Sequence, residues 1–140
     1  MTKHDNVSQE GIMKATEFVK KHGIEKARVV VDEAPDVLAT HYCFRKIAHY
    51  YAIECATWFY DGEWHPSDCH SEDDLIDSYG VNFVVNLSDL KRLVESHELV
   101  NHMGGLEKAM DAVINQEANG RNMTQLAQAI ADVEACHEVN

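Results

Sequence analysis

The chain has 140 residues and a mass of 15.8 kDa, a length typical of one domain, which we expect to span residues 1–140. It carries 12 lysines and arginines against 24 aspartates and glutamates, so its formal net charge is −12. Such a charge repels phosphate, which argues against direct binding of nucleic acid and against binding to an anionic membrane. The charge is compatible with binding to a basic protein, with binding of a metal cation, or with a surface that imitates a nucleic acid.

Residues 1–35 are predicted to form a helical corner. Asn6 or Ser8 suits the N-cap of the first helix, which carries an apolar stripe at helical spacing. Gly23 is typical of the position just after a helix end. A second helix is expected over 24–34, although its three consecutive valines also suit a strand.

Residues 36–86 are predicted to form a small antiparallel sheet. Asp61 and Gly62 stand between β-favouring flanks, which predicts a two-residue type I′ hairpin turn with Tyr60 and Glu63 on either side of it. The other elements expected in this part are strands at about 39–44, 50–55 and 81–85, and a short helix that follows a Ser71 cap and ends before Gly80.

Residues 87–136 are predicted to form three helices, the first capped by Ser88 and the last running from about 122 or 124 to 135. The sequence at 105–109 repeats the pattern at 23–27, Gly-Ile/Leu-Glu-Lys-Ala, so both are expected to be helix–glycine–helix corners. His97 lies on an apolar stripe, which favours a partly buried, hydrogen-bonded histidine over a metal ligand. The predicted fold class is therefore α+β: a helical corner, a small antiparallel sheet with a β-hairpin, then three helices.

The net charge is concentrated in the middle third of the chain. Residues 1–46 carry a net charge of +1, residues 47–90 carry −9, and residues 91–140 carry −4. The middle segment contains no lysine or arginine, and eight of the 11 aromatic residues fall inside it. Nine carboxylates without a neighbouring base lose local ion pairing, so their mutual repulsion costs stability.

This composition predicts a surface that binds a protein partner. Aromatic residues are favoured at the centres of interfaces, and surrounding carboxylates steer a basic partner. An alternative stays open, in which the aromatic side chains fill the core face of the sheet and the carboxylates are only solvated. The candidate partner-binding residues are Trp58, Tyr60, Asp61, Glu63, Trp64, Asp68, Glu72, Asp73, Asp74 and Asp77.

A second hypothesis is a zinc- or thiol-dependent site. Its candidate residues are Cys43, Cys55, His65, Cys69 and His70. Zinc prefers four such ligands, but the sequence lacks the paired C-x2-C spacing that marks a strong site. Cys69 and Cys136 each precede a histidine, yet neither lies in a recognisable nucleophile turn. We therefore expect no cofactor and a non-enzymatic protein.

Targeting signals are not expected. The first ten residues are polar, and no apolar run approaches the roughly 20 residues that span a bilayer. The four cysteines lack regular spacing, which favours free thiols in a reducing cytoplasm over disulfides.

The helix-corner segments, residues 90–96 with 104–109 and residues 23–27 with Ala34-Pro35, resemble small accessory proteins of tailed phages and prophages. The resemblance covers about a third of the chain and brings no catalytic residue with it. It implies an inhibitor that blocks a basic or nucleic-acid-binding host protein, such as a restriction enzyme, a CRISPR effector or a nuclease. A third hypothesis is that the chain is a structural helical module that binds other copies of itself, for example as a homodimer.

Overall fold

The computed structural model describes residues 2–137, with side chains for residues 11, 12 and 14–137. The fold class is α+β, as predicted, with helices before and after one antiparallel sheet. The elements in chain order are α1 (Thr2–His22), α2 (Ile24–Asp32), β1 (His41–Cys43), β2 (His49–Ala52), β3 (Thr57–Tyr60), β4 (Glu63–Pro66), α3 (Glu72–Tyr79), the 3-10 helix η1 (Val81–Phe83), β5 (Val84–Asn86), α4 (Leu87–His102), α5 (Leu106–Ala118) and α6 (Thr124–His137).

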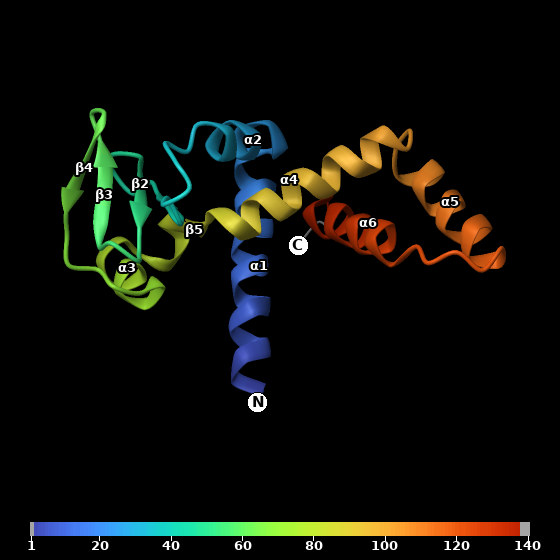
Figure 1. Cartoon of the computed structure of the whole chain (residues 1–140), viewed down its shortest axis with the longest axis horizontal. Helices are drawn as coiled ribbons and strands as arrows, with labels where there is room; N and C mark the ends of the chain where they lie inside the picture. The colour runs from blue at the N-terminus through green and yellow to red at the C-terminus, as the bar shows by residue number, and fades with distance from the viewer. Residues whose placement is uncertain (1, 138–140) are drawn as a thin grey trace.

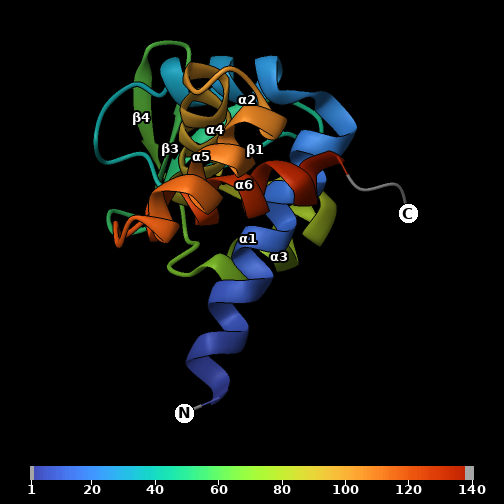
Figure 2. The same ribbon diagram turned by 90° about the vertical axis from the view of Figure 1, so that its right-hand side faces the viewer.

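The five strands form one sheet in the order β4-β3-β2-β1-β5, with every neighbouring pair antiparallel. One face packs against α1, α2 and α4 through side chains such as Tyr42 and Val85. The other face packs against α3 through Tyr51 and Val84, which share a buried cluster with Leu75. The sheet lies at one end of the molecule, and the N-terminal half of α1 extends away from the other elements (Figures 1 and 2).

Helix α4 joins the two halves of the molecule. Leu90 and Leu93 are fully buried in the cluster that includes α1, α2 and the sheet. About two turns after Leu93, Val100 is buried in a separate cluster with α5 and α6. The helix therefore contributes to two cores along its length, because its apolar stripe continues from the half of the molecule with the sheet to the half with α5 and α6. Figure 1 shows α4 running between these two halves.

Both glycine corners are confirmed. Gly23 has φ of 89° and Gly105 has φ of 111°, values that a side chain disfavours, and a helix starts directly after each.

Three predicted boundaries are wrong. Helix α1 already begins at Thr2, so the positions proposed as caps lie inside it, and Asn86 caps α4 in place of Ser88, because its side chain accepts from Asp89 N. The segment 81–83 is a 3-10 turn, and only residues 84–86 pair with β1.

His97 is buried, as predicted, with 6% of its surface exposed. Its Nδ1 donates to the carbonyl oxygen of Leu93 at 2.8 Å, one turn earlier in α4. Burial lowers the pKa of His97, which favours the neutral ring.

A buried carboxylate, Asp132, fastens α6 to α4. Only 6% of Asp132 is exposed, and its two oxygens accept from Arg92 Nε at 3.0 Å and from Arg92 Nη2 at 2.8 Å. Ser96 Oγ donates to the same group at 2.7 Å, and Gln128 Nε2 at 3.1 Å. The hydrogen bonds to Asp132 raise the pKa of Arg92. A charge in this position is tolerated because four donors replace its hydration.

A second polar junction ties β1 to α3 and α1. His41, 5% exposed, has Nε2 at 2.9 Å from Glu72 Oε1, and Lys14 Nζ lies 3.6 Å from the other Glu72 oxygen. His41 Nδ1 lies 2.9 Å from Thr40 Oγ1, whose hydroxyl donates to the carbonyl oxygen of Tyr51. Both ring nitrogens of His41 therefore have a hydrogen-bond partner, although the ring is almost fully buried.

We predict that Asp132→Asn lowers the free energy of unfolding by about 2 kcal/mol, because the amide cannot satisfy the Arg92 and Ser96 donors as the carboxylate does. Urea unfolding followed by circular dichroism measures the change. The matched control is Asp111→Asn on the exposed side of α5, for which a change below about 0.5 kcal/mol is expected. Equal effects of the two substitutions would contradict a structural role of Asp132.

We predict that Glu72→Gln destabilises the fold by about 1–2 kcal/mol at neutral pH, and that the difference from wild type shrinks below about pH 4. The hydrogen bond from His41 lowers the pKa of Glu72. A lowered pKa means that the stabilisation is present above the unfolded-state pKa and is lost as pH falls through the folded-state pKa. Unfolding at several pH values checks this, and a difference that stays constant from neutral to acidic pH would rule out the ion pair.

Candidate functional site

The predicted type I′ hairpin is confirmed and organises the candidate surfaces. Asp61 and Gly62 both have positive φ, 54° and 82°, as this turn requires. Tyr60 pairs with Glu63 across the turn, and Phe59 pairs with Trp64 in the next row. Side chains alternate between the faces of a strand, so neighbouring aromatic residues of the hairpin point in opposite directions.

The face toward α3 carries an ordered array of rings around Trp58. Its ring is stacked with that of Tyr60, with centroids 5.6 Å apart, and lies 5.1 Å from that of His65. His49 of the next strand approaches the same ring edge-on at 5.2 Å. Tyr60 remains 42% exposed, so the array reaches the surface beyond α3.

The face toward the helices carries Phe59 and Trp64, with their rings 5.2 Å apart in an edge-on arrangement. Trp64 Nε1 donates to Asp36 Oδ2 at 3.2 Å, although the two residues are 28 positions apart. The other oxygen of Asp36 accepts from the Leu38 backbone N–H at 2.8 Å. Asp36 therefore holds the segment between α2 and β1 against the hairpin.

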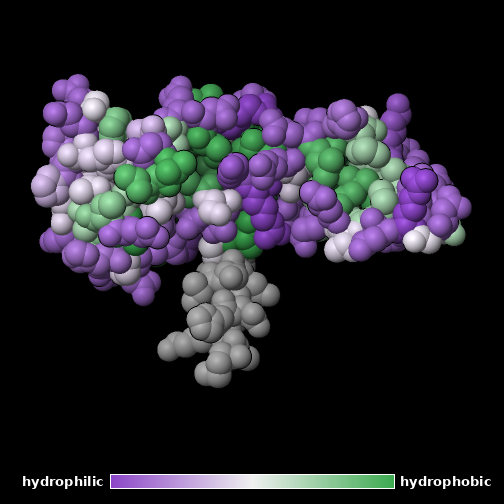
Figure 3. Space-filling model, in the orientation of Figure 1, coloured by the Kyte–Doolittle hydropathy of each residue, from purple (hydrophilic) through white to green (hydrophobic). Residues whose placement is uncertain are grey.

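That segment exposes apolar side chains. Val37 is 99% exposed and Leu38 is 45% exposed. Figure 3 shows hydrophobic residues gathered between the sheet and α2 on this side of the molecule. Glu33 and Asp36 are exposed, and no lysine or arginine occurs in residues 29–44 or 47–90. We call Glu33, Asp36, Val37, Leu38 and Trp64 the loop–hairpin surface.

The structure does not gather the ten predicted partner-binding residues on one face. Asp61 and Glu63 lie at the hairpin turn, whereas Glu72 begins α3 near the opposite end of the strands, where it meets His41. Some predicted carboxylates also have internal partners. Glu72 accepts from His41, and Asp74 accepts from the His70 backbone N–H at 2.9 Å. The remaining predicted residues are Asp68 and Asp77, which are exposed; Asp73, which lines a groove; Trp58 and Tyr60, in the ring array; and Trp64, on the opposite face of the hairpin.

The predicted metal or thiol residues are dispersed. Cys43 and Cys69 are buried in one apolar cluster, whereas Cys55 is exposed. His65 packs on Trp58, and His70 is exposed. Among the side chains that the structure describes, those of residues 11, 12 and 14–137, no three of His, Cys, Asp or Glu are placed to hold a metal ion.

The buried thiols are poor nucleophile candidates. Burial raises the pKa of Cys43 to about 12 and that of Cys136 to about 11, so both remain protonated at neutral pH. A thiol reacts as the thiolate, which neither environment supports.

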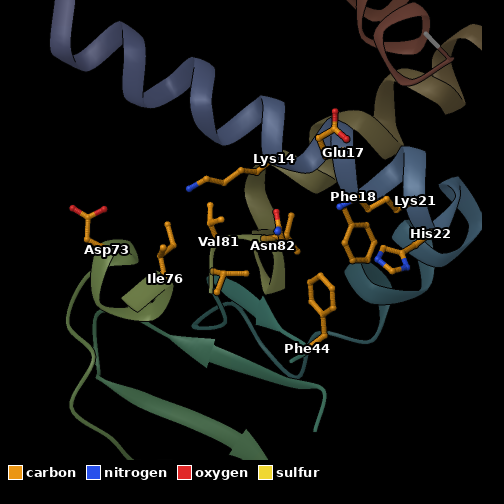
Figure 4. Close-up of a pocket in the computed structure, with 12 residues that line it drawn as sticks. Lys14, Glu17, Phe18, Lys21, His22, Phe44, Asp73, Ile76, Val81 and Asn82 are labelled. Atoms are coloured by element: carbon orange, nitrogen blue, oxygen red, sulfur yellow. The ribbon is translucent and has the colours of Figure 1, made fainter. Parts of the chain in front are cut away.

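A groove of about 460 Å³ separates α1 from α3 (Figure 4). Lys14 and Asp73 lie toward one end, and the rings of Phe18 and Phe44, 5.4 Å apart, form the other end. Lys14 is paired with Glu72, and carboxylates as well as cations line the groove. Its charge therefore does not favour one class of ligand.

Sequence reasoning missed residues on both sides of the sheet. Val37 and Leu38 could have been noticed in the sequence, because they are two adjacent apolar residues that directly follow Pro35 and Asp36, outside any predicted helix or strand. The two cations Arg45 and Lys46 were counted only toward the net charge of residues 1–46. In the structure they lie in the turn between β1 and β2, next to the sheet.

Among the described residues, no helix has the length and apolar character needed to cross a membrane. Comparison with protein-family models, with curated proteins and with solved structures found no match to this chain.

Proposed function

We propose that this chain is a non-enzymatic binding protein that covers a basic surface of another protein with its loop–hairpin surface. The observation that carries the proposal is the exposure of two adjacent apolar side chains, Val37 and Leu38, which directly follow Asp36, the acceptor of the Trp64 hydrogen bond. Exposing them to water is unfavourable, at about 25 cal/mol per Å² of apolar area, and a partner relieves this cost. Isolated apolar residues are common on surfaces, but a contiguous group with an aromatic ring is typical of interfaces.

The charge around this surface supports a basic partner. Glu33 and Asp36 precede the apolar residues in the same exposed segment, and residues 29–44 and 47–90 contain no lysine or arginine. Carboxylates beside an apolar surface accelerate encounter with a cationic partner and disfavour anionic ones. The hydrogen bond from Trp64 to Asp36 and the turn at residues 61–62 pre-organise the surface, which lowers the entropy cost of binding.

The kind of partner we propose is a nucleic-acid-binding protein of a bacterial host. Such proteins present the cationic surfaces that a chain of net charge −12 complements. The resemblance of the helix corners to phage accessory proteins supports an inhibitory, counter-defence role in the host cytoplasm. A reducing cytoplasm also suits the four free cysteines.

We predict that the immobilised protein captures a basic protein from bacterial lysate at low salt, and that excess duplex DNA or high salt releases it. The variant Glu33→Lys should reduce capture at least about tenfold, because like charges then face each other. Val37→Ser/Leu38→Ser should weaken it through loss of apolar contact.

The matched control is Glu117→Lys on α5, which makes the same change in net charge at an exposed position far along the chain. The control variant should capture the same protein as the wild type. Equal loss in both charge-reversal variants would show that only net charge matters, and undiminished capture by the Glu33 variant would place the interface elsewhere.

A further inference from the structure

A pocket of about 440 Å³ lies on the face of the sheet toward α3, away from the loop–hairpin surface. This volume is within the range of small-molecule sites. Trp58 and His49 come from the central strands, and Tyr79 comes from the end of α3. The turn between β1 and β2 supplies the other wall, formed by Arg45, Lys46 and Ile47.

Hydrogen bonds order the aromatic walls. Burial raises the pKa of Tyr79 to about 12, so its hydroxyl is protonated and donates to His49 Nε2 at 3.1 Å. The other nitrogen, Nδ1, then carries hydrogen and donates to the Ile47 carbonyl oxygen at 2.9 Å. Burial lowers the pKa of His49, consistent with a neutral ring in this single tautomer. The two rings and the turn are therefore fixed before any ligand binds.

Trp58 supplies a flat apolar wall. It is half-buried, and Tyr60, His65 and His49 hold its ring through the contacts described above. A ring held in this way loses little side-chain freedom when a planar ligand packs against it.

The charge of the pocket is opposite to that of the chain. Arg45 and Lys46 both line it, and no aspartate or glutamate does. Arg45 Nη1 donates to the Tyr79 carbonyl oxygen at 3.4 Å, and its guanidinium lies 6.0 Å from the centroid of the Phe83 ring. In the described part of the chain, neither cation has a carboxylate within ion-pair distance. Two cations without carboxylate partners, in a chain with twice as many acids as bases, favour an anionic ligand.

We propose that this pocket binds a small planar aromatic anion, with the ring against Trp58 and the anionic group at Arg45 and Lys46. Phosphorylated nucleosides and aromatic carboxylates share this chemistry. A nucleic-acid strand does not fit as well, because the net charge of −12 repels every phosphate outside the pocket. The proposal is independent of the protein partner, since Trp58 and Trp64 lie on opposite faces of the hairpin.

The two tryptophans permit a direct test. In Trp64→Phe, Trp58 is the sole tryptophan and reports on the pocket. Saturable quenching of its fluorescence is expected with adenosine 5′-monophosphate, benzoate or both, and the pair shows which anionic group is preferred. Adenosine and inorganic phosphate, each lacking one half of the ligand, should bind at least about tenfold more weakly. In Trp58→Phe, the emission of Trp64 should not respond.

Substitution of the cations completes the test. Arg45→Gln/Lys46→Gln in the Trp64→Phe background should weaken binding of the responding anion about tenfold or more, whereas Lys91→Gln on the exposed side of α4 should not. Circular dichroism confirms that each variant is folded. The proposal is overturned if neither anion quenches, if adenosine binds as tightly as its monophosphate and benzoate does not bind, or if an oligonucleotide binds more tightly than the mononucleotide.

Discussion

Both candidate binding surfaces depend on the register of one hairpin. The turn at Asp61 and Gly62 needs positive φ at both positions, which aspartate tolerates and glycine adopts freely. That turn pairs Tyr60 with Glu63, and the pairing assigns Trp58 and Trp64 to opposite faces. A slip of one residue would exchange the faces of every aromatic side chain in the shifted strand. Each proposed binding surface exists only because this register holds.

The rest of the fold keeps the two faces distinct. The helices α1, α2 and α4 cover most of one face, and α3 covers the middle of the other. What remains uncovered is the hairpin edge, with the segment of Val37 and Leu38 on one side and the β1–β2 turn on the other. Two buried polar contacts oppose movement of these elements relative to one another: Asp132 with Arg92 joins α6 to α4, and His41 with Glu72 joins β1 to α3. Separating either pair would leave a buried or half-buried carboxylate without its hydrogen-bond donors.

Local chemistry explains what could be predicted from the sequence. The hairpin turn, the Ser71 cap and the glycine corners depend on residues within a few positions of one another, and all were predicted. One of the misplaced boundaries involves local competition: Asn86 and Ser88 both suit an N-cap, and local sequence does not decide between them. The candidate site was harder because its contacts are distant in sequence. Glu72 is used inside the fold because it pairs with His41, which is 31 positions away. Val37 is exposed in a segment whose position depends on the hydrogen bond between Asp36 and Trp64. A count of charges cannot distinguish a carboxylate used inside the fold from one available to a partner.

The most direct test of two independent faces is to titrate the single-tryptophan variants with an amphipathic peptide of leucine and lysine. The account predicts that Trp64 emission in Trp58→Phe changes saturably and loses this response at high salt, because the peptide resembles the basic partner proposed for the loop–hairpin surface. Trp58 emission in Trp64→Phe should stay unchanged, since two cations line its pocket. Equal responses of the two tryptophans, or a response of Trp58 alone, would contradict the division of the hairpin into two binding faces.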